Sequence, residues 1–234
     1  MEGSSGENSL TFTRLSCDGE EGYPGNLLVS VRYTFDDECR LGIHYQALCD
    51  QDTVINLTNH SYFNLDGEDS GSVEGQHLQI FADSFAENDA GCLPTGRIVS
   101  LDSEEGAPFD FREPTEIGKR LHEENIHLKN GSGYDHNYLL KKQPDGLCAR
   151  AYSRSSGILL ECRTSEPGMQ LYTGNFLSTS NIVGKGGKSY ADRAGFCLET
   201  QHYPNAMEHP EFPSVVLPAG ELYDTTTEYH ISLL

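Results

Sequence analysis

The sequence feature that most constrains the fold is a two-residue alternation of apolar and polar side chains early in the chain. One alternating run spans residues 27–35, and a second follows a short acidic break at residues 36–38. Their apolar members are Leu27, Val29, Val31, Tyr33 and Phe35, and then Leu41, Ile43, Tyr45 and Ala47. Two such runs about a short polar break predict a β-hairpin.

Further strand-like runs follow along the chain, and only one short helix is predicted. The strand candidates are residues 77–81, 147–154, 157–164, 169–172, 195–199 and 229–233. Thr115 can cap the helix, and Ile117 and Leu121 lie four residues apart on one face of it. Many strands with almost no helix indicate an all-β sandwich or barrel. Because no repeat, linker or composition shift appears, we predict a flexible polar start over residues 1–9 and a single domain over residues 10–234.

The stretch TNHSYFNLDG, residues 58–67, ends a third alternating run that begins at residue 55. The apolar residues of this run share one parity and His60 has the other, so a regular strand would turn His60 away from the core. Neutral imidazole gives and accepts a proton near physiological pH, which suits catalysis. Hydrogen-bonded core histidines are nevertheless the more frequent case. The stretch alone favours a structural histidine, and the parity weakens that interpretation.

Charge and cysteine content exclude several classes of function. The 16 basic and 36 acidic residues give a net charge of −20, which repels phosphate backbones and anionic lipid, so we expect no nucleic acid and no membrane as partners. The seven cysteines are scattered without a C-x-x-C pair, which favours reduced thiols over disulfides or a zinc site. The start has no apolar signal core, and no stretch approaches the ~20 apolar residues of a membrane span. We therefore expect a cytoplasmic protein.

Four short stretches combine titratable or amide side chains with aromatic residues and glycine. They are NHSYFNL (59–65), GYDHNYL (133–139), EPGMQLYTGNFL (166–177) and FCLETQHYPNA (196–206). Most strand carboxylates face solvent or pair with a basic residue. Glu199 follows three apolar residues, however, and a partly desolvated carboxylate gains proton affinity and can act as a general base. Planar amides and carboxylates among aromatic rings suit the recognition of a sugar.

Taken in order, and together with SCDGEEGYPGNL (16–27), these stretches resemble the galactose mutarotase (aldose 1-epimerase) family from about Leu10 to the C-terminus. The resemblance implies a large antiparallel β-sandwich. It also implies a cofactor-free and metal-free interconversion of the α and β anomers of hexoses such as galactose and glucose. Position by position, Glu199 matches the general base that removes the C1 hydroxyl proton, and His60 matches the general acid that protonates the ring oxygen. Asp135 and Gln170 match residues that bind the sugar hydroxyls.

The resemblance changes the interpretation of His60 from structure to catalysis. Ring opening needs one proton removed and one delivered at positioned sites. We therefore expect the strand face of His60 to line a sugar site, with Asn59 or Tyr62 nearby. Its ring should approach Glu199 across a cavity of sugar size.

The resemblance also implies an N-terminal segment that this sequence does not contain. In the family, that segment carries an Asn-Arg pair that contacts the sugar and a second active-site histidine in a His-Gly-Gly context, and neither motif occurs here. We therefore expect a sandwich without its first strands, self-association through exposed sheet edges, and weakened activity. A splice form, a gene-model truncation and a genuinely shortened protein all fit.

Three functions stay open at this point. The first is a mutarotase, and the second is a sugar-binding or partner-binding module without turnover. The third, an epimerase of hexose 6-phosphates, would need a cluster of basic residues for the phosphate. Only 16 Lys and Arg occur in the chain, and none lies inside the four stretches, which disfavours the third function.

Overall fold

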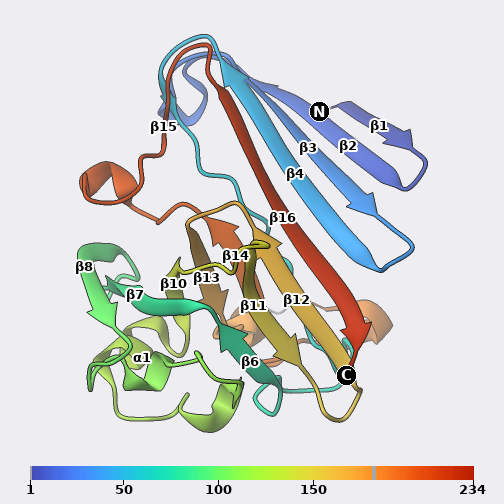
Figure 1. Ribbon diagram of the computed structural model, residues 1–234, viewed down its shortest axis with the longest axis vertical. Coiled ribbons are helices and arrows are strands. Elements are labelled where there is room, and N and C mark those ends of the chain that lie inside the picture. The colour runs from blue at the N-terminus through green and yellow to red at the C-terminus, as the bar shows by residue number, and fades with distance from the viewer. Residues whose placement is uncertain (1, 181–182) are drawn as a thin grey trace.

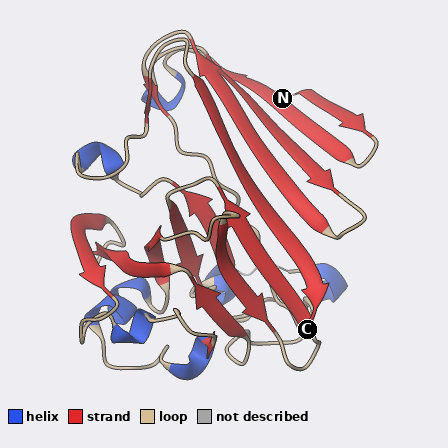
Figure 2. Cartoon of the chain, in the orientation of Figure 1, coloured by secondary structure: helices blue, strands red, loops and turns tan. Residues whose placement is uncertain are grey.

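Antiparallel strands make up nearly all of the regular structure in the computed structural model, which describes residues 2–180 and 183–234 (Figures 1 and 2). The strands are β1 (Glu2–Gly6), β2 (Ser9–Ser16), β3 (Leu27–Phe35), β4 (Arg40–Cys49), β5 (Thr53–Val54), β6 (His77–Ile80), β7 (Ala82–Asn88), β8 (Pro94–Ser100), β9 (Thr115–Glu116), β10 (Asp135–Leu140), β11 (Leu147–Tyr152), β12 (Ile158–Thr164), β13 (Gly168–Tyr172), β14 (Cys197–Gln201), β15 (Val216–Leu217) and β16 (Leu222–Leu233). Among the described residues, α1 (Ile126–Gly131) is the one α-helix. Short 3-10 helices lie at Glu20–Gly22, Ala107–Phe109, Ile117–Lys119, Leu177–Ser180, Lys185–Gly187 and Ala206–Glu208.

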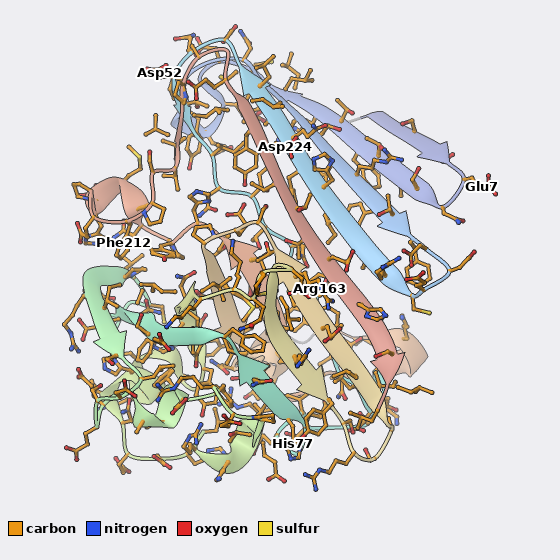
Figure 3. All side chains as sticks on the ribbon, viewed as in Figure 1. Glu7, Asp52, His77, Arg163, Phe212 and Asp224 are labelled. Atoms are coloured by element: carbon orange, nitrogen blue, oxygen red, sulfur yellow. The ribbon has the colours of Figure 1, made fainter. Side chains whose placement is uncertain are left out.

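Two large sheets and one small one organise these strands. The nine-stranded sheet has the order β1-β2-β3-β4-β16-β12-β11-β6-β9, the five-stranded sheet has the order β14-β13-β10-β7-β8, and β15 pairs with β5. In Figure 1 the long strands β3, β4 and β16 extend past the five-stranded sheet toward the top of the view. Figure 3 shows Asp224 on this extension and Glu7 at the turn between β1 and β2.

The core fills the space between the facing sheets. From the five-stranded sheet, alternate residues turn inward and are buried, namely His136, Tyr138, Met169, Leu171, Leu198 and Thr200. The nine-stranded sheet contributes Ile43, Tyr45, Ala149, Ala151, Leu160 and Cys162. Burying apolar surface contributes about 25 cal/mol per Å², so these alternations fix which face of each strand is internal. The predicted all-β antiparallel sandwich is confirmed.

Most of the predicted strands lie where the alternation placed them. The expected hairpin is the β3–β4 pair, in which Val31 lies opposite Tyr45. The other six candidate ranges overlap β6, β11, β12, β13, β14 and β16. The predictions missed β2, β7, β8 and β10, as well as the short strands β1, β5, β9 and β15. All seven cysteines are free.

Residues 55–65 do not form the expected strand. The predicted alternation is nevertheless observed, because the apolar residues face inward and His60 faces outward. The segment is extended, with Ile55 and Leu65 buried and His60 exposed. Its backbone bonds to separate partners instead of one neighbouring strand: Ile55 N–H donates to Val215 and Phe63 N–H to Phe196. Because no single strand lies alongside the whole segment, its backbone forms no continuous row of sheet hydrogen bonds, even though its apolar residues alternate.

The helix predicted after Thr115 is also wrong. Thr115 and Glu116 form β9 and pair with β6, and a single 3-10 turn follows. Ile117 and Leu121 are both buried as their spacing suggested, but sheet pairing overrides the local helical preference. The observed helix α1 begins after Asn125, whose side chain accepts hydrogen bonds from the N–H groups of the first turn.

Residues 2–6, expected to belong to a flexible polar start, form the edge strand β1. Each of these residues has a partner in β2, from Glu2 opposite Thr13 to Gly6 opposite Ser9. Backbone pairing needs no apolar side chain, so the polar composition of this segment concealed the strand. None of the described helices is long and apolar enough to cross a membrane.

Candidate active site

The face of β10, β13 and β14 that points away from the core carries two cross-strand rows of side chains. One row is Asn137, Gln170 and Glu199, and the next is Asp135, Tyr172 and Cys197. Because side chains alternate along a strand, residues two apart share a face. The same alternation that buries Leu171 and Leu198 therefore brings both rows to one surface.

His60 reaches this surface from the extended segment 55–65. The two mutual backbone hydrogen bonds between Phe63 and Phe196, 2.8 and 2.9 Å long, anchor the segment beside the start of β14. From there the Nε2 atom of His60 lies 3.4 Å from Oε1 of Glu199. The His60 side chain is 51% exposed and that of Glu199 only 10%. One partner of the pair is therefore open to a ligand and the other is largely removed from water.

A hollow of about 310 Å³ lies at this pair, a size at the lower end of small-molecule sites. Its lining residues are His60, Tyr62, Asp135, Gln170, Tyr172, Phe176, Glu199, Gln201 and Pro204. The ring centroids of Tyr62 and Tyr172 lie 4.9 and 5.8 Å from that of His60. The hollow therefore combines aromatic faces with hydrogen-bonding groups, the pattern that a sugar requires.

Asp135 and Gln170 form a polar pair on the floor of the hollow. Nε2 of Gln170 donates a 2.7 Å hydrogen bond to Oδ1 of Asp135. Oε1 of Gln170 is buried and has no partner among the described residues, and the same holds for both polar atoms of Asn137. A buried acceptor without a partner is costly. Gln170 is therefore prepared to accept a hydrogen bond from a ligand hydroxyl.

Burial sets the electrostatics of the site. Removal from water, reinforced by the negative charge of Asp135, raises the pKa of Glu199 to about 7. Burial also raises the pKa of Asp135, although the Gln170 hydrogen bond and the nearby His60 oppose this shift. A carboxylate with a raised pKa is a stronger base, and it is most useful when its pKa lies near the working pH.

Cys197 contacts the other side of the His60 ring. Its Sγ lies 3.3 Å from Nδ1 of His60, and the thiol is fully buried. His60, Cys197 and Glu199 also form the one group in the described part of the chain whose potential metal-ligand atoms all lie within 4.8 Å. Burial, with the charges of Glu199 and Asp135, raises the pKa of the Cys197 thiol.

A larger hollow of about 550 Å³ lies beyond Tyr62 and is mainly apolar. Its lining includes Phe63, Leu160 and Ile231, with Glu68 and Lys185 among its few charged groups. Among the described residues that line it, no histidine lies beside a carboxylate. The smaller hollow, which His60 and Glu199 line together, is therefore the candidate active site.

The structure brings together all four residues that the sequence singled out. His60, Glu199, Asp135 and Gln170 line one hollow. Tyr62 lines it too, whereas Asn59 instead donates to the Tyr229 hydroxyl at 3.1 Å. The sequence interpretation missed Tyr172, Phe176, Cys197, Gln201 and Pro204 as neighbours of the site. The two-residue spacing of Cys197 and Glu199 in FCLET was a signal that could have identified Cys197.

Comparison with known proteins agrees with this geometry. The family profile described as aldose 1-epimerase matches residues 2–230. The chain is 45% identical over 227 residues to the galactose mutarotase of Bos taurus, which covers 97% of this chain and 64% of the relative. It is 37% identical to the aldose 1-epimerase of Escherichia coli, with 95% of this chain and 64% of the relative covered. The chain thus spans 64% of the length of these curated relatives.

Solved structures show the same similarity in three dimensions. An aldose epimerase homologue from C. elegans superimposes with a TM-score of 0.87 at 30% identity, over 100% of this chain and 68% of that one. The galactose 1-epimerase of Lactobacillus acidophilus gives a TM-score of 0.83 at 27% identity, over 99% of this chain and 65% of that one. The two-sheet arrangement is therefore one that these proteins share.

Proposed function

Because the chain belongs to the aldose 1-epimerase family, we propose that it interconverts the α and β anomers of free hexoses such as galactose and glucose, without a cofactor. The observation that carries this proposal is the 3.4 Å approach of His60 Nε2 to Glu199 Oε1 at a hollow of about 310 Å³. A base and an acid that face the same small volume are what ring opening requires.

In the first half of the proposed reaction, the Glu199 carboxylate takes the proton of the C1 hydroxyl. The electrons of that O–H bond form the C1 carbonyl, and the bond between C1 and the ring oxygen breaks. The His60 imidazolium delivers its Nε2 proton to the departing ring oxygen. The products of this half are the open-chain aldehyde, a neutral Glu199 and a neutral His60.

In the second half, rotation about the C1–C2 bond presents either face of the aldehyde to the ring hydroxyl. His60 takes back the proton from that hydroxyl as its oxygen attacks C1, and Glu199 returns its proton to the carbonyl oxygen. Both residues end in their starting protonation states. The cycle therefore has no net proton or electron to supply, which fits the proposal that no cofactor takes part.

We assign substrate binding to Asp135 and Gln170. The Asp135 carboxylate accepts hydrogen bonds from sugar hydroxyls, and the unpartnered Oε1 of Gln170 accepts another. The aromatic faces of Tyr62 and Tyr172 cover the C–H side of the ring. Among the described residues, no Lys or Arg lines the hollow, which disfavours a sugar phosphate as substrate.

A sugar-binding module without turnover is the second candidate. It is favoured by the 51% exposure of the His60 side chain, because an open site screens an acid–base pair with water. Polarimetry of freshly dissolved α-galactose separates the two functions. An enzyme raises the rate of mutarotation in proportion to protein concentration, whereas a binding module leaves the spontaneous rate unchanged. Methyl α-galactoside, which cannot open, then measures binding alone as a competitor.

Four further expectations complete the proposal. The net charge of −20 supports the absence of nucleic-acid and anionic-membrane partners. We also propose a cytoplasmic location, one domain over residues 10–234, and self-association through sheet edges such as β1, the outermost strand of its sheet. Sedimentation at several protein concentrations tests the self-association.

A further inference from the structure

We infer that Cys197 is a positioning residue that holds the His60 ring with Nε2 toward the sugar while the ring gains and loses its proton. The catalytic part of this inference rests on the proposed function. The contact itself does not, because it is present in the ligand-free protein. Cys197 touches neither the proposed substrate nor the reacting atoms; it acts through His60.

The first support is that both nitrogen atoms of the ring face a polar atom. Sγ of Cys197 lies 3.3 Å from Nδ1, and Oε1 of Glu199 lies 3.4 Å from Nε2. A flip of the ring would move Nδ1 away from the thiol and point a carbon atom at it. The remaining ring contacts of His60 in the described structure are aromatic, with Tyr62 and Tyr172, and they do not distinguish nitrogen from carbon.

The second support is the fixed position of the thiol. Cys197 is fully buried in β14 and lies directly opposite Tyr172 of β13. His60, by contrast, is carried on a segment with scattered backbone partners, and its side chain is half exposed. A buried strand residue therefore supplies a fixed hydrogen-bonding partner for a half-exposed ring.

The third support is chemical. The proposed acid step takes His60 from an imidazolium with protons on both nitrogens to a neutral ring whose proton is on Nδ1. A thiol is both a weak donor and a weak acceptor, so Sγ accepts from Nδ1–H in these two states. When the resting ring is neutral with its proton on Nε2, the S–H group donates to Nδ1 instead.

A charged partner would not serve all of these states. A carboxylate or thiolate at Nδ1 would stabilise the imidazolium and weaken His60 as an acid. The buried environment of Cys197 keeps the sulfur as a neutral thiol, consistent with its raised pKa. Cys197 thus orients the ring without binding its proton tightly.

The test compares Cys197→Ala with Cys197→Ser in the whole chain. Loss of one neutral hydrogen bond should lower kcat roughly 3- to 10-fold in the alanine variant, with KM changed less than about twofold. Serine, which also donates and accepts, should restore most of the loss. Cys49→Ala is the matched control, because Cys49 is also buried but its Sγ contacts Pro24 O; it should keep the wild-type kcat.

Nitrogen NMR of the His60 ring gives a second result that does not depend on turnover. In the ligand-free protein, Cys197→Ala should shift the Nδ1 signal and its titration, and Cys197→Ser should bring them back toward the wild type. An unchanged Nδ1 signal in Cys197→Ala would overturn the inference even if the chain is a mutarotase. An altered signal would support the contact even if the wild type shows no mutarotation, and in that case the proposed function alone would fail. A wild-type kcat in an active Cys197→Ala would overturn the positioning role.

Discussion

The carboxyl groups of Asp135 and Glu199 share one face of the five-stranded sheet, two strands apart, and the charge of Asp135 helps to raise the pKa of Glu199. Asp135 therefore has two effects on the proposed reaction. It offers acceptors to sugar hydroxyls, and it adds to the burial that makes Glu199 a stronger base.

The first prediction concerns the pH dependence of the reaction. Glu199 must be ionised to take a proton, so kcat/KM should rise with pH through the Glu199 pKa of about 7. Asp135→Asn removes the repelling charge and should lower the pKa of Glu199. The rise of kcat/KM with pH, its acidic limb, should therefore move to lower pH. The maximum value of kcat/KM should also fall, because the sugar binds more weakly. Polarimetric pH profiles of both proteins check this. Asp83→Asn, on β7 outside the hollow, should leave the profile in place, and an unmoved limb in Asp135→Asn would contradict the electrostatic coupling.

The second prediction concerns stability. The pKa of Glu199 rises from its ordinary value of 4.5 to about 7 on folding, so between these pH values the folded state keeps a proton that the unfolded state has released. The free energy of unfolding should therefore fall as pH rises through this window. Glu199→Gln cannot ionise, so its free energy of unfolding should not fall in this way. At about pH 8 the variant should be more stable than the wild type, by at most about 3 kcal/mol. At about pH 4.5 the two should be much closer.

Denaturant unfolding at these two pH values measures the difference. The result that contradicts the account is a Glu199→Gln variant that is no more stable than the wild type at the higher pH. That outcome would mean that the Glu199 carboxylate is as well solvated in the folded protein as in the unfolded chain.

The third prediction concerns the floor of the hollow. Gln170→Ala deletes the 2.7 Å hydrogen bond to Asp135 and the free acceptor beside it. Hydrogen bonds to charged groups contribute about 1.5–3 kcal/mol, so kcat/KM should fall roughly 10- to 100-fold, mainly through KM. Gln79→Ala serves as the control, since Gln79 donates to Arg112 O away from the hollow. Equal KM values for Gln170→Ala and the wild type would remove Gln170 from substrate binding.

The fourth prediction concerns a buried carboxylate just before β13. Glu166 is 2% exposed and accepts hydrogen bonds from His202 Nδ1 at 2.7 Å and from the Tyr223 hydroxyl at 3.1 Å. These bonds tie the segment just before β13 to His202, which follows β14, and to Tyr223 of β16. Glu166→Ala leaves both donors without their acceptor and should lower the free energy of unfolding by about 3–5 kcal/mol. Chemical denaturation measures the loss, and a change within about 0.5 kcal/mol, as at surface sites, would show that the bonds are dispensable.

The regular part of the fold could be predicted because it depends on apolar alternation. β4 and β12 each bury one face, and the apolar face of β3 is partly buried, so their sequences carry the period of the strand. β1 escaped prediction because its pairing uses backbone groups and polar residues, and Thr115 escaped because pairing with β6 decides its conformation. Tertiary partners of this kind leave no local pattern.

For the candidate site, the sequence identifies the main residues but does not show how they come together. His60, Asp135, Gln170 and Glu199 could be named because the four stretches, taken in order, resemble the aldose 1-epimerase family, whereas each stretch alone is a weak signal. Their meeting at one hollow depends on the registers of β10, β13 and β14 and on the Phe63–Phe196 bridge. The contact of Cys197 with His60 follows from that register, and no property of FCLET alone indicates what the thiol touches.

The most direct test of the account is the protein-dependent rate of α-galactose mutarotation in His60→Gln, Glu199→Gln and the double variant, measured by polarimetry against the wild type. Loss of a positioned acid or base costs about 10²–10⁴-fold, and residues that act as one unit lose little more when both are removed. The account predicts a loss of that size in each single variant and nearly the same loss in the double variant. Glu228→Gln, on β16 outside the hollow, should retain the wild-type rate. A folded Glu199→Gln or His60→Gln protein with near-wild-type catalysis would contradict the central claim that these two residues open and close the sugar ring together.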